Sequence, residues 1–502
     1  MGSLGAFGRL AGAGFLLVRN DALLPRELTE LYPPTVRALA DALRAFAGPQ
    51  SRKGRPGERL AWSLERLGPV AIKLGQLLST RADIFGAEFV QDLSHLKDRL
   101  PAFSTEIARR EVEAGLGRPI ESLFSSFGEP VAAASLAQAH EATLTDGRRV
   151  AVKVLRPGIA RRVAEDSEVL ALAAGLVERW APPARRLEPR AFADTVIRAT
   201  ELELDLRIEA AGADELGEVM ARDGHMSAPR VVWDGVGKKV LTLEWAKGVA
   251  LTDPAALEQP GLERKTLADN LVRAFLAQAL DHGVFHADLH EGNLFVAAPG
   301  ELTAVDFGIM GRLGPAERRY LAEILYGFLE RDYQRVARMH FEAGYVPRTQ
   351  SVEAFAQALR AVGEPVFGRT ASQVSMSRLL TQLFEITALF DMHLRPELVL
   401  LQKTMMTVEG VARKIDPEHD LWAAADPVVR RWMIRELSPA ARARRFMDDA
   451  ATVIRNLAER LEAPPAAPVA PEPPPEPASG LLWFAIGAAT AGAAFLIGAL
   501  IG

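Results

Sequence analysis

The stretch FHADLHEGN, residues 285–293, together with VDFG at residues 305–308, decides the fold of this chain. It places His286, Asp288 and Asn293 in the order His-x-Asp-x-x-x-x-Asn, and Asp306 follows after a predicted hairpin. An aspartate in such a loop can position an attacking hydroxyl or water, and the oxygens of Asn293 and Asp306 suit Mg²⁺. The pattern predicts a phosphoryl-transfer site with Asp288 as the catalytic residue, Asn293 and Asp306 as metal ligands and His286 as a support of the loop.

A site of this kind also needs a lysine on a strand, and the chain offers two similar sequences. VAIK at 70–73 lies among leucines with helical spacing, so Lys73 is expected on a helix. VAVK at 150–153 follows a run of small residues and an Asp-Gly turn, which predicts a hairpin with Lys153 on its second strand. Lys153 is therefore the predicted phosphate-binding and catalytic lysine.

The small residues before this hairpin predict a loop that approaches the phosphates closely. The loop has alanine where many phosphate loops have glycine, so we expect it to be stiffer. The predicted nucleotide-binding residues of the loop are Ala132, Ala133, Ala134 and Ser135. A second predicted hairpin at 230–245 leads to a hinge, where Glu244 and Ala246 are also expected to bind the nucleotide. The acidic partner of Lys153 is expected within 201–209, with Glu209 on a helix that faces the nucleotide.

The order of these elements predicts an α+β, protein-kinase-like fold with a small lobe of strands and a helical C-lobe. Two features differ from an ordinary protein kinase. A helical segment with Lys73-Leu-Gly-Gln76 precedes the small lobe, and the chain enters a helix near Pro315 without an Ala-Pro-Glu sequence or room for a peptide platform.

These departures together resemble the UbiB family, also called the ABC1/ADCK group of atypical kinase-like proteins. The segments that carry the resemblance are LGPVAIKLGQLLSTRADIF, AAASLAQAH, VAVKVLRP, ELDLRIEAA, FHADLHEGN, VDFGIMGRL and LVLLQKTMMTVEGVARKIDP. The resemblance implies ATP or ADP and Mg²⁺ as ligands, a Lys153–Glu209 pair, and an extension in which catalytic Lys73 and Gln76 cover the site. It also implies that Lys73 meets Glu203 and Asp205 beside the nucleotide, and that the protein serves ubiquinone biosynthesis at a membrane.

The C-terminal end of the sequence predicts a membrane anchor. Residues 481–502 carry no charge, and twenty-two helical residues reach about 33 Å, enough to cross a bilayer core. Small residues four apart on this span are compatible with a homo-oligomer formed through it. We expect one span in the bacterial inner membrane, with the main body cytoplasmic. The predicted segments are amphipathic helices at 1–55, the extension at 56–125, the small lobe at 126–248, the C-lobe at 249–440, a juxtamembrane helix at 441–462, a Pro-rich linker at 463–479 and the transmembrane helix at 480–502.

Composition narrows the possible functions. The formal net charge of -5 argues against a nucleic-acid partner, and the absence of cysteine excludes disulfides and thiolate chemistry. Three functions remain open: an ATPase or small-molecule kinase that acts on access to, or assembly around, polyprenyl quinone intermediates; a nucleotide-gated scaffold without required catalysis; and a protein kinase acting in trans. The expected partners are membrane lipid, polyprenyl quinone precursors and the enzymes of ubiquinone biosynthesis.

Overall fold

The structure is a computed structural model that describes residues 3–31, 34–79, 86–94, 96, 101–180, 185, 188–364, 386, 389–392 and 396–437. Its helices are α1 (Ser3–Arg19), α2 (Pro34–Leu43), α3 (Pro56–Leu67), α4 (Pro69–Leu78), α6 (Ala87–Ser94), α7 (Thr105–Leu116), α8 (Ile159–Trp180), α9 (Pro189–Leu202), α10 (Leu206–Asp223), α11 (Arg264–Ala277), α12 (Pro315–Leu329), α13 (Tyr333–Glu342), α14 (Val352–Gly363), α16 (Pro396–Ile415) and α17 (Leu421–Leu437). Its strands are β1 (Phe124–Ala133), β2 (Ala137–Leu144), β3 (Arg149–Leu155), β4 (Val240–Glu244), β5 (Val249–Ala250), β6 (Val284–His286), β7 (Leu294–Ala297), β8 (Glu301–Ala304) and β9 (Met310–Arg312). The predicted mixture of helices and strands is thus present in the structure.

The small lobe is an antiparallel sheet in the order β1-β2-β3-β4. The Asp146-Gly147 turn joins β2 to β3 as predicted, and Lys153 lies on β3 opposite Ala139 of β2. Valines alternate with Lys153 along β3, and Val150, Val152 and Val154 are fully buried in a cluster that includes residues of α7 and β2. This period of two sends Lys153 to the opposite face of the sheet.

The second hairpin predicted at 230–245 is only partly present. Val240–Glu244 is a strand, but its expected partner is reduced to two isolated bridges, Val231 with Leu243 and Gly237 with Val240. A 3-10 helix at Trp233–Gly235 interrupts the segment instead. Thr242 donates a hydrogen bond from its hydroxyl to the Gly235 carbonyl oxygen at 2.9 Å, which holds this turn against β4.

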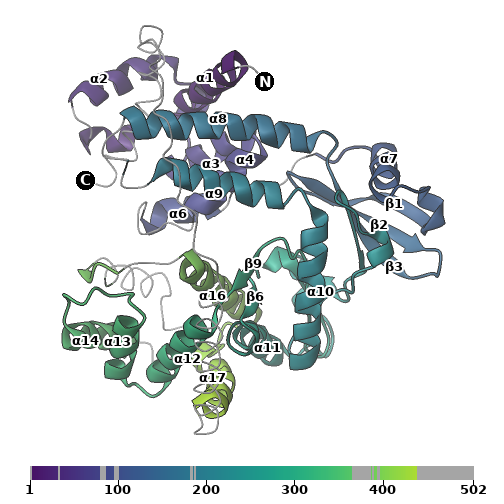
Figure 1. The fold of residues 1–502 in the computed structure, drawn as a ribbon, viewed down its shortest axis with the longest axis vertical. Helices are drawn as coiled ribbons and strands as arrows, with labels where there is room; N and C mark the ends of the chain where they lie inside the picture. The colour runs from purple at the N-terminus through teal and green to yellow at the C-terminus, as the bar shows by residue number, and fades with distance from the viewer. Residues whose placement is uncertain are drawn as a thin grey trace, which may run out of the picture.

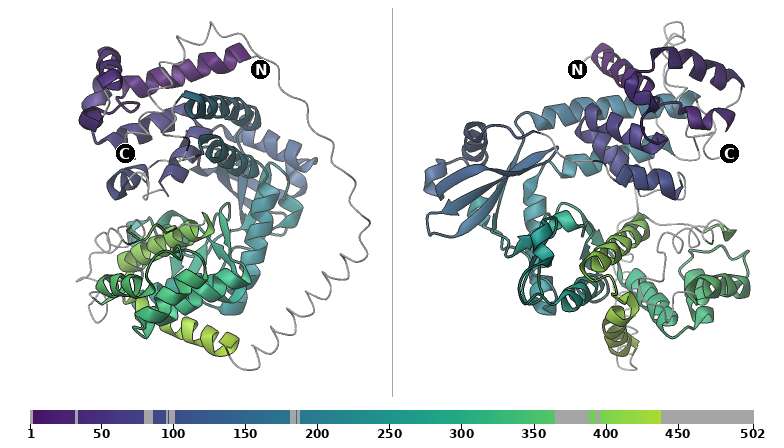
Figure 2. Two further views of the ribbon diagram at one scale, coloured as in Figure 1. Left: turned by 60° about the vertical axis from the view of Figure 1, so that its left-hand side comes forward. Right: turned by 180° about the vertical axis from the view of Figure 1, so that it is seen from behind.

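The extension predicted from helical leucine spacing is helical. Gly68, with a φ of 116°, separates α3 from α4, and Pro69 occupies the first turn of α4. In space α4 packs against α8 and α9, so the extension and the two long helices after β3 form one helical layer. Figure 1 shows α8 and α9 side by side within this layer, and Figure 2 shows the layer from behind, above the C-lobe.

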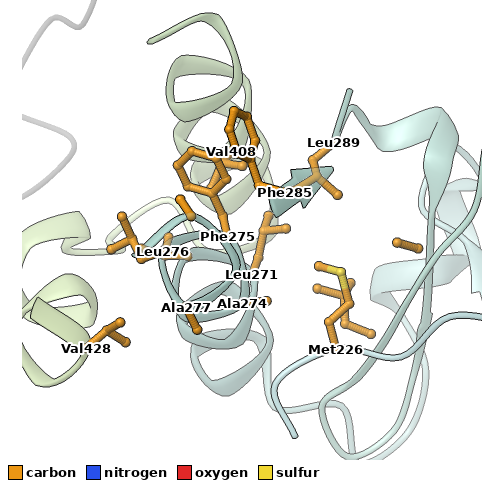
Figure 3. Packing of buried hydrophobic residues seen from close by; sticks show 14 of the residues in the cluster. Met226, Leu271, Ala274, Phe275, Leu276, Ala277, Phe285, Leu289, Val408 and Val428 are labelled. Atoms are coloured by element: carbon orange, nitrogen blue, oxygen red, sulfur yellow. The ribbon is translucent and has the colours of Figure 1, made fainter. Parts of the chain in front are cut away.

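The C-lobe is built around α11. Leu267, Leu271 and Phe275 are buried on this helix, and the cluster around them draws in α16, α17 and β6. Figure 3 shows Phe275 near Val408 of α16 and Phe285 of β6, and Val428 of α17 on another side of α11. Two of the predicted strands, β7 and β8, form the hairpin that carries the chain from Asn293 towards Asp306. Because α12 begins at Pro315, a helix follows Gly308 within a few residues, as the sequence predicts.

Within the described residues, no helix has the length and apolar character needed to cross a membrane. The predicted juxtamembrane helix, Pro-rich linker and transmembrane helix at 441–502 all lie outside these residues.

Candidate active site

The centre of the site is a lysine held between two carboxylates from different lobes. Lys153 Nζ donates to Glu209 Oε1 at 2.8 Å and to Glu209 Oε2 at 2.9 Å, and it lies 3.2 Å from Asp306 Oδ1. Glu209 is in the first turn of α10, and Asp306 follows the β7–β8 hairpin of the C-lobe. The structure therefore brings together three predicted residues that are separated by up to 153 positions in sequence.

The pKa values in this triad follow from burial and mutual attraction. Burial raises the pKa of Glu209 to about 7, against the opposing pull of Lys153. The ammonium group of Lys153 lowers the pKa of Asp306 to about 2. Burial alone would lower the pKa of Lys153, but the carboxylates of Asp306 and Glu209 together raise it above its ordinary value. Lys153 is thus a fixed cation, as a phosphate-binding lysine must be.

His286 fixes the loop that carries Asp288. Its ring is fully buried, with Nε2 3.1 Å from the Val305 carbonyl oxygen and Nδ1 accepting the Asp288 backbone N–H at 3.1 Å. These partners require a neutral ring with its hydrogen on Nε2, and burial lowers the pKa of His286, which agrees. The ring therefore links the loop to the residue just before Asp306, while the Asp288 carboxyl remains partly exposed, 3.5 Å from His290 Nε2.

The predicted metal ligands, Asn293 and Asp306, each carry a side-chain oxygen of the kind that Mg²⁺ prefers. Asn293 Nδ2 donates to the Asp288 backbone carbonyl oxygen at 3.0 Å, which leaves the side-chain oxygen of Asn293 as a possible ligand. Asp306 has a φ of 61°, and its side chain is half exposed. In the described part of the chain, no group of three or more His, Cys, Asp or Glu side chains could hold a metal by itself. Mg²⁺ usually takes one or two protein oxygens and completes its shell with phosphates and waters, so these two residues are a sufficient protein contribution.

The alanine-rich loop forms the tip of the β1–β2 hairpin. Ala132 and Ala133 end β1, and the Ala134 N–H donates to the Ala137 carbonyl oxygen at 2.8 Å across the turn. The Ser135 residue is buried at the tip. The predicted phosphate loop is therefore a tight reversal of two strands, on the same sheet as Lys153.

The predicted hinge residues lie between the lobes. Glu244 ends β4, and Ala246 lies between β4 and β5, which pairs with β7 of the C-lobe. The Glu244 carboxylate pairs with Arg148 at 3.0 Å. Because its carboxylate is engaged with Arg148, we expect Glu244 to contact a nucleotide through its backbone, as we do Ala246. Both contacts remain predictions.

The extension reaches the site through Lys73. Lys73 is 9 % exposed on α4 and forms an ion pair with Glu203, in the short segment between α9 and α10. Burial raises the pKa of Glu203 although Lys73 pulls it down, and the charges of Asp306 and Lys153 are near enough to act on it as well. The pair therefore lies next to the Lys153 triad, where the resemblance implied a cover.

Asp205 and Gln76 differ from this expectation. Asp205 caps α10 by accepting the Arg207 backbone N–H at 3.2 Å, and its carboxylate also binds the Arg207 side chain, at 2.6 Å at its nearest. Its carboxylate is thus occupied locally, and the predicted meeting with Lys73 is not observed. Gln76 lies one turn after Lys73 and is half-buried, and its side chain makes no hydrogen bond with another residue that the structure describes.

Several supporting residues carry signals that sequence analysis did not use. Gln138 and His140 are buried on alternate positions of β2, a polar pair on a face otherwise filled by apolar side chains. Gln278, the first residue of the π-helix Gln278–His282 that follows α11, accepts the His286 N–H at 3.1 Å. The Thr404 hydroxyl on α16 shares its one hydrogen between the carbonyl oxygens of Ala287, at 3.1 Å, and Leu400, at 2.8 Å. A polar residue at a buried position of a regular pattern was the available signal in each case.

The fold and the site together define an atypical kinase-like protein. A family model described as ABC1 atypical kinase-like domain matches residues 95–340, and one described as UbiB helical domain matches residues 359–420. The chain belongs to the UbiB family. It is 40% identical over 432 residues to a probable protein kinase UbiB from Marinobacter nauticus, which covers 85% of this chain and 78% of that relative. It is 38% identical over 462 residues to a protein of the same name from Xanthomonas axonopodis pv. citri, covering 90% of this chain and 80% of the relative.

A solved structure supports the fold independently. The Rv3197–erythromycin complex from Mycobacterium tuberculosis matches with a TM-score of 0.50 at 24% identity, over 73% of this chain and 93% of that one. The family predicted from the sequence is thus confirmed, and the fold class is confirmed as kinase-like.

Proposed function

We propose that this chain binds an adenine nucleotide with Mg²⁺ at the site around Lys153 and uses ATP turnover to support ubiquinone biosynthesis at the bacterial inner membrane. The observation that carries the proposal is the Lys153–Glu209–Asp306 triad, because it joins both lobes around one fixed cation. The names of the UbiB relatives support the quinone role.

Each residue has a defined task in this proposal. Asn293 and Asp306 would hold Mg²⁺, which neutralises phosphate charge when it is bound. Lys153 would place its charge on the α- and β-phosphates while Glu209 keeps the side chain extended. Asp288, presented by the His286-supported loop, would position the attacking water or hydroxyl.

The acceptor in this proposal is water or a small molecule. The Lys73–Glu203 pair lies beside the triad, and α12 starts at Pro315, which leaves little chain for a peptide platform. Polyprenyl quinone precursors in the membrane, or the enzymes that modify them, would then receive the effect of turnover through access or assembly. A protein kinase acting in trans would need a surface that this arrangement does not favour.

The test combines biochemistry with complementation. The full-length chain in liposomes with a phenolic quinone precursor should turn over ATP, and a deletion strain should recover ubiquinone with the wild type but not with Asp306→Asn. Absence of turnover in the liposomes, together with full recovery by Asp306→Asn, would contradict the proposal.

A second candidate is a nucleotide-gated scaffold, which the buried Lys73–Glu203 pair favours because a closed cover can report nucleotide binding without hydrolysis. The two functions separate at Asp288. A scaffold keeps ubiquinone synthesis in cells carrying Asp288→Asn but loses it with Lys153→Ala, whereas an ATPase loses it with both.

A further inference from the structure

Arg156, just after β3, connects the alanine-rich loop to the segment before α7. Its Nε donates to the Ala134 carbonyl oxygen at 2.9 Å, and its Nη1 donates to the Pro101 carbonyl oxygen at 2.9 Å. Its backbone N–H donates to the Leu136 carbonyl oxygen at 2.8 Å. One arginine therefore holds the loop carbonyls on both sides of Ser135.

The other end of this connection is itself anchored. Gln138 accepts the Phe103 N–H at 2.9 Å and donates to the Phe103 carbonyl oxygen at 3.1 Å, so its amide pairs with both polar groups of Phe103. Gln138 also donates to His140 Nε2 at 2.7 Å, and His140 Nδ1 donates to the Gly128 carbonyl oxygen at 2.9 Å. Gln138 and His140 are 2% and 0% exposed, so segment 101–104 is fixed to the small lobe by a buried, satisfied network.

This network lies on the face of the sheet opposite to Lys153. Gln138 pairs across the sheet with Val154 and His140 with Val152, and these valines belong to the cluster shared with α7. Arg156 contacts Pro101 and lies 5.8 Å from the centre of the Phe103 ring, so it reaches the loop from the same face. Lys153 alternates with these valines, so its side chain lies on the other face, where it meets Glu209 and Asp306.

Because a peptide bond is planar, the hydrogen bond from Arg156 to the Ala134 carbonyl oxygen also fixes the direction of the Ser135 N–H. In a trans peptide, a carbonyl and the next N–H point in opposite directions. With the Ala134 carbonyl directed to Arg156, the Ser135 N–H points away from Arg156 and so away from the face that carries Gln138 and His140. A reversed peptide would instead direct the negative end of a carbonyl dipole away from Arg156.

We propose that Arg156 is a positioning residue that sets the orientation of the Ala134–Ser135 peptide, so that the Ser135 N–H faces the phosphates of a bound nucleotide. This inference rests on the proposed nucleotide site and names the residue that fixes the conformation of the alanine-rich loop. An alanine-rich loop lacks the conformational freedom of a glycine-rich one, and the arginine fixes the geometry of the loop from the side of Pro101 and Phe103. Arg156 should therefore affect binding of phosphates and not of adenosine.

The experiment measures the affinities of the full-length chain for MgATP and for adenosine. Arg156→Ala should weaken MgATP binding about tenfold, the loss expected for one hydrogen bond to a charged group, and leave adenosine unchanged. Arg156→Lys keeps the charge but has one donor group for two separated carbonyls, so its loss should be smaller. Arg161→Ala is the matched control, because it removes a neighbouring positive charge that is 86% exposed and pairs only loosely, at 3.7 Å, with Glu165.

The outcomes separate this inference from the proposed function. If MgATP and adenosine weaken equally in Arg156→Ala, or if Arg161→Ala reproduces its effect, the inference is overturned. If the wild type binds neither ligand, the proposed function fails instead. Should Arg156→Ala not fold, which thermal denaturation would reveal, Arg156→Lys carries the same comparison of MgATP with adenosine.

Discussion

Asp306 combines a strained backbone with a strongly stabilised charge. Its φ of 61° is uncommon for a residue with a side chain and costs on the order of 1–3 kcal/mol. Phe307, 2% exposed, packs against the His286 ring at 5.2 Å and holds this conformation in place. The strain presents the carboxylate to Lys153, where its low pKa keeps it ionised at every physiological pH.

Replacing this carboxylate should abolish turnover without unfolding the chain. Asp306→Asn keeps the shape but removes the charge that faces Lys153 and the proposed metal. We expect ATP turnover to fall by about 100-fold or more, since a single preorganised electrostatic group contributes that much in many enzymes. Asp234→Asn, at an exposed aspartate of the small lobe, is the control and should behave as the wild type. If Asp306→Asn turns over ATP within about twofold of the wild-type rate, Asp306 has no catalytic or metal-binding role.

Glu209 should make the stability of the nucleotide-free protein depend on pH. Its pKa is about 7 in the folded chain against an ordinary value of 4.5, so between these values the folded state binds a proton that the unfolded state has released. Stability should therefore fall as the pH rises from 4.5 to 7, by at most about 1.4 kcal/mol per pH unit. The difference in melting temperature between the wild type and Glu209→Gln, measured from pH 5 to 8, should decline up to pH 7 and then level off. A difference that stays constant across this range would contradict the assigned burial.

At the scale of elements, helix α16 packs against the loop that carries Asp288 and contacts it through Thr404 and Lys414. Thr404 is 1% exposed, and its hydroxyl lies 3.1 Å from the Ala287 carbonyl oxygen and 2.8 Å from the Leu400 carbonyl oxygen. At the far end of the helix, Lys414 forms an ion pair with Glu291 of the same loop. The helix thus contacts the loop on both sides of Asp288.

Thr404→Val should loosen this support while keeping the side-chain volume. It removes the hydroxyl hydrogen that Thr404 shares between Ala287 and Leu400, so we expect a loss of about 1 kcal/mol in stability and a several-fold lower ATP turnover. Thr407→Val is a matched control on the same helix, because the Thr407 hydroxyl donates only to the Lys403 carbonyl oxygen, at 3.0 Å. Thermal denaturation and turnover assays of both variants make the comparison. Equal effects of the two variants would mean that the contact with Ala287 has no role.

Elements with local signals were predictable, and elements that depend on distant backbone were not. The Asp146-Gly147 turn and the valines of β3 placed Lys153 correctly, because both signals lie within a few residues of it. The segment 230–245 alternates like a strand pair, but the turn held by Thr242 replaces most of the first strand. The hydrogen bonds from Arg156 to Ala134 and Pro101 could not be predicted from the sequence, because their acceptors are backbone carbonyl oxygens, which every residue carries.

At the scale of the whole molecule, two ion pairs at the site join separate elements to α10 and to the segment just before it. Lys153 with Glu209 joins β3 to α10, and Lys73 with Glu203 joins the extension to the start of α10. The second pair spans 130 positions, and only the family resemblance, not local spacing, indicated it. The charges of Asp306 and Lys153 also act on the pKa of Glu203, so we expect a change of charge at the Lys153 triad to affect the Lys73–Glu203 pair.

A double-mutant cycle at Lys73 and Glu203 tests whether the cover is held by this pair. Removing either partner leaves the other charge largely buried, so the single variants Lys73→Met and Glu203→Gln should each be clearly less stable, with a coupling energy of about 2 kcal/mol or more. The exposed pair of Arg312 and Glu215, 66% and 40% exposed, is the matched control and should give a coupling of about 1 kcal/mol or less. Thermal denaturation of the full-length chain without nucleotide gives the four stabilities of each cycle, and hydrogen exchange over α4 reports the cover directly. If the two cycles give equal couplings, and α4 exchanges no faster in Lys73→Met, then packing rather than this ion pair keeps the extension over the site.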